Sequence, residues 1–224
     1  MIKIFAYIQI ISLALFLSLV IGKTIYLRKK EKISAIKINI FAKEGLKHIF
    51  EIIMFVSVNI WTFGLLAYAL KDAFGIFSTL PEYKLFNLLY LKILGLFFII
   101  IGFIFFVLAL LNLGNSWRLG IDDKNPGKLV TSGIYSLSRH PIYLFFNLYF
   151  FGTFIINANI IFLIFTIILA SVLHIQIIRE EKFLVKVFGK EYTNYMQSVS
   201  RYLTFKTFAN RKKFIYLFRF EKAE

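Results

Sequence analysis

The residues of this chain that are best suited to chemistry form two polar clusters beside long apolar runs. Arg139 and His140 directly precede one apolar run, and Glu180 and Glu181 lie just beyond the next. Ionisable side chains at the ends of membrane-length segments are costly to keep unless they bind a charged partner. Donors at a helix start attract a carboxylate, whereas glutamates attract an ammonium group. The two clusters together therefore indicate a site for a charged or zwitterionic ligand.

A purely structural explanation of the first cluster stays open at this point. Arg139 can place its charge among lipid headgroups, and His140 can cap a helix without binding a ligand. The acidic pair favours a site, because carboxylates beside a basic membrane boundary need a cationic partner. That partner is Arg139, Arg179 or the ammonium group of a ligand.

Composition decides the class of protein that must position these clusters. The chain is 59% hydrophobic, with 28 phenylalanines in 224 residues and a mean hydropathy of +0.74. A soluble domain of 26.2 kDa cannot bury so much apolar surface, which therefore faces lipid. Because the chain has no cysteine, it has no disulfide, thiolate metal site or cysteine nucleophile. With three histidines, a structural zinc cluster is not expected, and we assign no metal.

Five apolar runs predict an all-α integral membrane protein with about five transmembrane helices. The predicted spans are 4–22, about 49–70, about 93–113, 142–156 and 160–178. Three residues separate the last two runs, so these form a C-terminal helical hairpin. The fourth run is short for a hydrocarbon core of roughly 30 Å. Folding the hairpin brings the two polar clusters together on one side of the membrane.

The basic residues predict the orientation of the chain. Of its 27 lysines and arginines, 23 fall in the loops and tail that the five spans place on one side. The excess marks the cytoplasmic side, so the N-terminus lies outside and the two polar clusters are cytoplasmic. The net charge of +15 suits anionic headgroups, at about 1 kcal/mol per basic residue near the surface. No nucleic-acid motif accompanies this charge.

The chain divides into three predicted regions. Residues 1–111 hold three N-terminal membrane helices, 112–203 hold the hairpin and the site, and 204–224 form a basic-aromatic interfacial tail. Local signals place a positive φ at Gly133, and a helix end at Phe188 followed by Gly189. We expect a multi-pass protein of a prokaryotic cytoplasmic membrane. Its expected partners are the lipid bilayer and an amphiphilic or small apolar molecule, with no nucleic acid and no obligate protein partner evident.

The order and spacing of these motifs resemble the isoprenylcysteine carboxyl methyltransferase family, which is related to phospholipid methyltransferases. The matching motifs are Leu-Val-Thr-Ser-Gly-Ile-Tyr at 129–135, Arg-His-Pro-Ile-Tyr at 139–143, Glu-Glu at 180–181, and Gly189, Tyr192 and Tyr195. The resemblance covers about residues 112–203. It implies a membrane enzyme that binds S-adenosyl-L-methionine on the cytoplasmic side, between the hairpin and the C-terminal segment.

The resemblance also implies individual site residues. The cofactor-binding residues would be Gly127, Lys128, Leu129, Val130, Tyr135, His140, Pro141, Ile142, Tyr143 and Glu180. Aromatic faces favour a sulfonium cation, which suits the tyrosines. We assign catalytic roles to Arg139 and Glu181. The family's substrate-binding arginine, four residues before the cofactor glutamate, is Gln176 here, and we assign Gln176 and Arg179 to the substrate.

The expected reaction is in-line transfer of a methyl group to a lipid-like or small apolar acceptor, with a prenylcysteine carboxylate among the candidates. The protein mainly supplies alignment and desolvation. One alternative is a sterol-reductase-like, NADPH-dependent membrane oxidoreductase, which uses a similar Arg-His-Pro-x-Tyr block. Those enzymes usually continue with glycine and an acidic residue, where this chain has Leu144, Phe145 and Phe146. A non-catalytic membrane protein is the third possibility.

Overall fold

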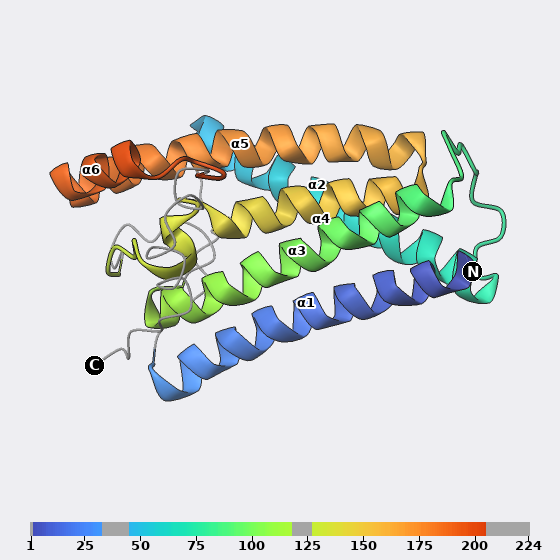
Figure 1. Ribbon diagram of the computed structural model, residues 1–224, viewed down its shortest axis with the longest axis horizontal. Helices are drawn as coiled ribbons and strands as arrows, with labels where there is room; N and C mark the ends of the chain where they lie inside the picture. Colours follow the sequence, from blue (N-terminus) through green and yellow to red (C-terminus); the bar gives the residue numbers. More distant parts are fainter. Residues whose placement is uncertain (1, 33–44, 118–126, 205–224) are drawn as a thin grey trace.

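The structure is a computed structural model that describes residues 2–32, 45–117 and 127–204 (Figure 1). The predicted interfacial tail at 204–224 lies outside these residues, apart from residue 204 itself. Within the described residues the fold is all-α, as predicted. The helices are α1 (Ile2–Lys30), α2 (Gly45–Phe74), α3 (Leu89–Leu113), α4 (Pro141–Asn157), α5 (Ile160–Phe188) and α6 (Lys190–Ser198), with short 3-10 helices η1 (Gly114–Ser116) and η2 (Gly133–Ser136).

The long helices run side by side as one bundle, with α6 and η2 at one end (Figure 1). Helices α1, α2, α3 and α5 are long and apolar enough to cross a membrane, and α4 is a shorter apolar helix. These five helices occupy the positions predicted from the apolar runs. Helix α5 continues past the predicted span to Phe188, the predicted helix end, so Glu180 and Glu181 lie on the helix itself.

The α4–α5 hairpin turns at Ala158, whose φ of 51° is left-handed. The Asn159 side chain caps α5 by accepting a hydrogen bond from the Ile161 amide at 2.8 Å. The α2–α3 connection covers this turn, because the Leu85 amide donates to Ala158 O and the Ile160 amide donates to Tyr83 O. The hairpin is therefore held at the end of the bundle opposite α6.

Helices α3 and α4 pack closely because glycines face each other across the interface. A Cβ atom on Gly152 would lie 2.6 Å from Gly95 O, and one on Gly95 would lie 2.7 Å from Gly152 O. Small residues allow such backbone approach between membrane helices. Nearer to α6, the fully buried Phe145 stacks on Phe106 with ring centroids 4.6 Å apart. This pair holds the first turns of α4 against α3.

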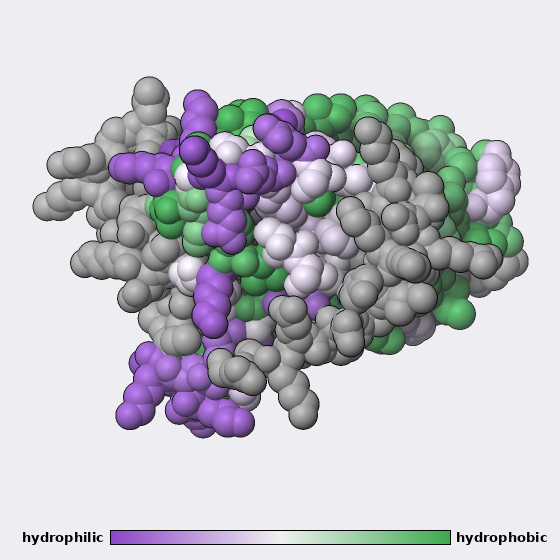
Figure 2. Space-filling view, turned by 60° about the vertical axis from the view of Figure 1, so that its left-hand side comes forward, coloured by the Kyte–Doolittle hydropathy of each residue, from purple (hydrophilic) through white to green (hydrophobic). Residues whose placement is uncertain are grey.

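The outer surface of the bundle is largely apolar. Large side chains such as Ile11 (65%), Phe63 (68%) and Tyr90 (65%) are well exposed. Hydrophilic residues instead gather at the end of the bundle that Figure 2 turns toward the viewer, while apolar surface extends behind them. This distribution suits a bundle whose sides contact lipid and whose end faces water.

Candidate functional site

The hairpin brings the two polar clusters into contact, as the sequence predicts. The Tyr143 hydroxyl donates to Glu180 Oε2 at 2.8 Å. Arg139 Nη2 lies 2.8 Å from Glu181 Oε1, and His140 Nε2 lies 3.3 Å from the same oxygen. The start of α4 and the last third of α5 therefore form one polar site at the end of the bundle that carries α6.

Glu181 is the centre of this site. Its side chain is 6% exposed, and those of Arg139 and His140 are 7% and 3% exposed. A third partner, Arg201, places Nη2 at 2.6 Å from Oε2 and Nε at 3.1 Å from Oε1. Charge-assisted bonds from two guanidinium groups offset the cost of burying the carboxylate. Arg201 follows α6 and lies outside every motif found in the sequence. Its positive charge was the one signal that the sequence offered for this residue.

The loop before α4 is held in shape by a glycine that the sequence marked for a positive φ. Gly133 has a φ of 59°, and a Cβ atom there would overlap the Asn112 side chain. Asn112 Oδ1 accepts the Ile134 amide at 2.8 Å, which fixes η2 to the end of α3. The positive φ at Gly133 is confirmed, and it allows the loop to approach α3.

The start of α4 answers one question that the sequence left open. Pro141 occupies the first helical turn, as expected, and His140 is the residue before the helix. The His140 side chain makes no capping hydrogen bond and faces Glu181 instead. Ser138 Oγ accepts the His140 amide at 3.1 Å. His140 is therefore part of the buried polar site, not a simple helix cap.

Two tyrosines close the site from the side of η2 and α6. Burial, followed by the nearby carboxylate of Glu180, raises the pKa of the Tyr135 hydroxyl well above its ordinary value. Burial also raises the pKa of Tyr195, whose hydroxyl donates to Tyr135 O. Both side chains therefore stay neutral at physiological pH. They offer aromatic faces and fixed hydrogen bonds without adding charge.

The segment at 127–130 lies beside these tyrosines. Val130 packs against the cluster of Ile134 and Tyr135, and Leu129 packs against Tyr192. Gly127 has a φ of 77° and is exposed, and the Lys128 amide donates to Ser116 Oγ at 3.2 Å, at the end of α3. The structure thus places Leu129 and Val130 against the tyrosine clusters of the site, whereas Gly127 and Lys128 are exposed beside Ser116.

The remaining predicted residues follow along the two helices of the hairpin. Ile142 packs against the Ile134 and Tyr135 cluster. Gln176 is 8% exposed, lies about one turn before Glu180, and is close to the Tyr143 hydroxyl. Arg179 lies on the same helix and is half-buried. The candidate site and the predicted substrate residues therefore share α5.

Two buried polar atoms of the site retain capacity for a ligand. Arg139 Nε and the Tyr192 hydroxyl have no hydrogen-bond partner among the described residues. Burial raises the pKa of Tyr192, so its hydroxyl remains a donor. Buried donors without partners are costly, and a polar ligand would satisfy them. Aromatic faces, a half-buried carboxylate and free donors together fit a cationic, zwitterionic cofactor such as S-adenosylmethionine.

Comparison with known proteins decides the family. A probable protein-S-isoprenylcysteine O-methyltransferase of Oryza sativa subsp. indica is 34% identical over 147 residues, covering 62% of this chain and 76% of the rice protein. The chain belongs to the isoprenylcysteine carboxyl methyltransferase family. The Saccharomyces cerevisiae protein-S-isoprenylcysteine O-methyltransferase is 34% identical over 110 residues, or 48% of this chain and 46% of the yeast protein. The sequence model of the phospholipid methyltransferase family matches residues 90–191.

A solved structure of a related protein has a similar fold. A eukaryotic intramembrane Ras methyltransferase, itself an isoprenylcysteine carboxyl methyltransferase, superposes with a TM-score of 0.57 at 21% identity. The match covers 92% of this chain and 68% of that chain, and it supports the membrane fold.

Family membership makes the chain a multi-pass membrane methyltransferase. The expected reaction class is thereby confirmed, and the sterol-reductase-like alternative is not favoured. The relatives compared above are eukaryotic, so they lend no support to the expected prokaryotic membrane.

Proposed function

We propose that this protein binds S-adenosylmethionine at the site formed by α4, α5 and η2, and methylates the carboxylate of a prenylated cysteine. The observation that carries the proposal is the contact between Tyr143 and Glu180 beside the buried Glu181 cluster. These residues stand at the positions that match the family's cofactor motifs.

The residues of the site suit the three charged groups of the cofactor. Glu180 keeps partial exposure and would bind the ammonium group, while His140 and the start of α4 would receive the carboxylate. The faces of Tyr135 and Tyr143 would lie near the sulfonium, where aromatic rings favour a cation. When bound, the cofactor supplies the reactive methyl group. The chain supplies binding, orientation and exclusion of water.

We propose that Glu181 and Arg139 act by holding the site in shape. A carboxylate bonded to two guanidinium groups is a weak base, so Glu181 is poorly suited to remove a proton. A carboxylate acceptor is already ionised and needs no general base. Gln176 and Arg179, on the same helix, would face the acceptor and donate to its carboxylate oxygens.

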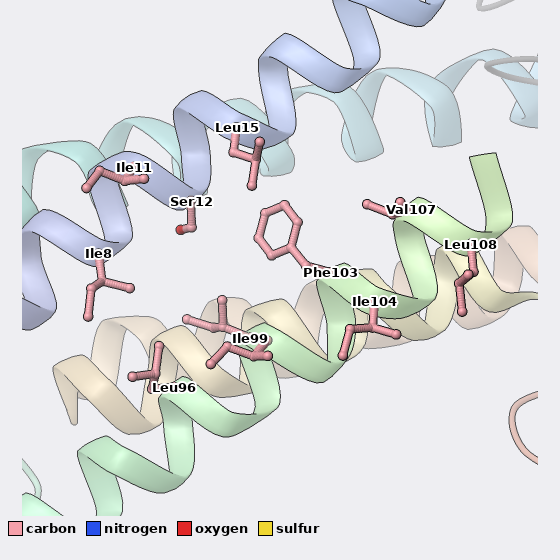
Figure 3. A pocket seen from close by; sticks show the side chains of 11 residues that line it. Ile8, Ile11, Ser12, Leu15, Leu96, Ile99, Phe103, Ile104, Val107 and Leu108 are labelled. Atoms are coloured by element: carbon pink, nitrogen blue, oxygen red, sulfur yellow. The ribbon is translucent and has the colours of Figure 1, made fainter. Parts of the chain in front are cut away.

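An apolar groove offers a place for the acceptor's tail. A cavity of about 520 Å³ lies between α1 and α3, with Ser12 the one hydroxyl-bearing side chain among its lining residues (Figure 3). Its lining residues Ile11, Ile100 and Ile104 are exposed, so the groove opens toward lipid. At its other end, Leu108 packs against the cluster that contains Tyr135. We propose that the acceptor's tail lies in this groove and that its polar group extends past Leu108 toward the site.

The experiment that tests this function starts with separate titrations of the detergent-purified protein with S-adenosylmethionine and with NADPH. We expect saturable binding of S-adenosylmethionine alone. Incubation with methyl-labelled cofactor and S-farnesylcysteine should then give a base-labile, lipid-extractable product. Binding of NADPH alone would favour the reductase, and label confined to strongly polar products would exclude a lipid-like acceptor.

A further inference from the structure

The segment that follows α6 folds back across the candidate site, and we call residues 199–204 the strap. The Arg139 amide donates to Ser200 O at 3.2 Å, and the Thr204 amide donates to Leu137 O at 2.8 Å. Ser138 Oγ donates to Arg201 O at 3.3 Å. The strap is thus bonded along the loop that leads into α4, so its own side chains lie over the start of that helix.

Two side chains of the strap reach α5 independently. The Tyr202 hydroxyl and His174 Nδ1 are 2.7 Å apart, and the two rings are nearly parallel. Arg201 reaches Glu181 with Nε and Nη2, which are 3.2 Å and 2.6 Å from Oε2. The Tyr202–His174 contact docks the strap on α5 by itself. Arg201 is therefore not needed merely to attach the segment.

The contacts of Glu181 show what Arg201 adds. Arg139 and His140 both contact Oε1, while Oε2 is bonded only by Arg201 among the described contacts. A guanidinium that bonds through two nitrogens fixes the plane of a carboxylate as well as its position. The Arg201 side chain is 33% exposed, and an exposed ion pair alone contributes little. Glu181 is buried, however, so the orientation of its carboxylate matters to the two residues that share Oε1.

We propose that Arg201 is a positioning residue of the cofactor site: it orients Glu181, which in turn orients His140 and Arg139. The inference rests on the proposed function, since it concerns cofactor affinity at the same site. It assigns a role to a residue of the strap that no sequence motif contains. Without the Arg201 side chain, Glu181 Oε2 loses its partner, and the contacts of Arg139 and His140 with Oε1 no longer fix the plane of the carboxylate. The start of α4 then loses the fixed geometry that a bound cofactor needs.

The test compares cofactor affinity in Arg201→Ala, Arg201→Lys and Tyr202→Phe. We expect Arg201→Ala to raise the Kd for S-adenosylmethionine about tenfold, and its KM similarly, with the acceptor KM unchanged. Arg201→Lys keeps the charge but not the two-nitrogen contact, so it should recover only part of the affinity. Tyr202→Phe removes the hydrogen bond between the strap and His174, keeps the ring, and should leave the affinity within about twofold of wild type. Equal losses in Arg201→Ala and Tyr202→Phe would assign the effect to the strap as a whole and overturn the proposal.

A double-mutant cycle separates an indirect role from direct contact with the cofactor. If Arg201 acts through Glu181, Arg201→Ala should have little further effect on affinity in a Glu181→Gln background. Full additivity would overturn the proposal, because it would mean that Arg201 acts without Glu181.

Hydrogen exchange tests the same idea without any cofactor. Amides at 137–144 should exchange faster in Arg201→Ala than in Tyr202→Phe, and unchanged exchange would contradict the inference. If the wild type fails to bind S-adenosylmethionine, the proposed function fails, and exchange alone then decides the role of Arg201. If Arg201→Ala does not fold, the same measurements on Arg201→Lys decide it.

Discussion

At the scale of single residues, the site is one buried carboxylate bonded to two arginines and a histidine, beside a second carboxylate that is bonded to a tyrosine. Glu180 and Glu181 are adjacent in sequence but differ in their surroundings. Glu180 is half-buried and accepts a hydrogen bond from Tyr143, whereas both oxygens of Glu181 are bonded to arginines. We propose that this difference separates Glu180, which is available to a ligand, from Glu181, which holds the site together.

The first prediction concerns the residues available to the cofactor. His140→Ala and Glu180→Ala should each weaken S-adenosylmethionine binding at least tenfold, or about 1.4 kcal/mol, because each removes a polar contact. Isothermal titration of the purified variants measures the change. Glu191→Ala is the matched control, since Glu191 is an exposed acidic residue of α6 and should bind as wild type. Unchanged affinity in both site variants would show that the clusters are structural only.

The second prediction concerns stability. Glu181→Ala leaves Arg139 buried without its counter-ion, and breaking one partner of a buried ion pair costs about 3–5 kcal/mol. Thermal unfolding in detergent should therefore begin at a clearly lower temperature than in wild type. Lys182→Ala, at the exposed neighbouring position, should unfold as wild type does. Matching unfolding curves for the two variants would show that the Glu181 cluster contributes little.

At the scale of secondary-structure elements, close packing of α3 on α4 places the site's helix start. The glycine pair at the crossing predicts that replacing glycine by alanine changes the stability of the protein differently at Gly152 and at Gly64. Gly152→Ala should destabilise the protein, because the new methyl group would overlap Gly95 O. Gly64→Ala meets nothing within 4 Å and should be neutral or stabilising by up to about 1 kcal/mol. Melting temperatures of the two variants are the measurement, and a shift of the same sign in both would refute the packing argument.

The groove between α1 and α3 gives a second prediction at this scale. Ile104→Trp should fill part of the groove and raise the KM for a farnesylated acceptor, while the Kd for S-adenosylmethionine stays unchanged. Ile164→Trp is the control, because Ile164 is as exposed on α5 (50% against 49%) and does not line the groove. A raised acceptor KM in both variants would point to a general effect on the bilayer-facing surface.

The elements differ in how much of them the sequence could predict. The hairpin follows from two apolar runs and a three-residue connection, and the positive φ values of Gly133 and Gly189 follow from local turn chemistry. The contact between the acidic pair on α5 and the cluster before α4 could be predicted, because a three-residue connection makes the two helices antiparallel. The role of Arg201 could not be predicted, because it depends on how the strap folds back over a distant helix. No local periodicity encodes that contact.

At the scale of the whole molecule, one end of the bundle carries the site together with the basic last turn of α1, which ends in Arg28, Lys29 and Lys30. We expect this end to be cytoplasmic. The chain has no cysteine, so single cysteines can be introduced without background. Ser132→Cys and Lys190→Cys, both exposed at this end, should react only with reagents that enter the cell. Lys84→Cys, at the opposite end, should react with reagents that stay outside the cell. The reverse labelling pattern would show that the predicted orientation is wrong.

The hydrogen bonds between the α2–α3 connection and the hairpin turn have a mechanical consequence. Leu85 and Tyr83 fasten the turn at Ala158 and Ile160, at the end remote from the site. The end of the hairpin at this turn is therefore fixed by backbone hydrogen bonds, whereas its other end is joined by side-chain contacts such as that of Tyr143 with Glu180. Tyr143 and Glu180 lie far from the fastened turn. We therefore expect a small rotation about the turn to displace these two residues, at the proposed cofactor site, far more than residues beside the turn.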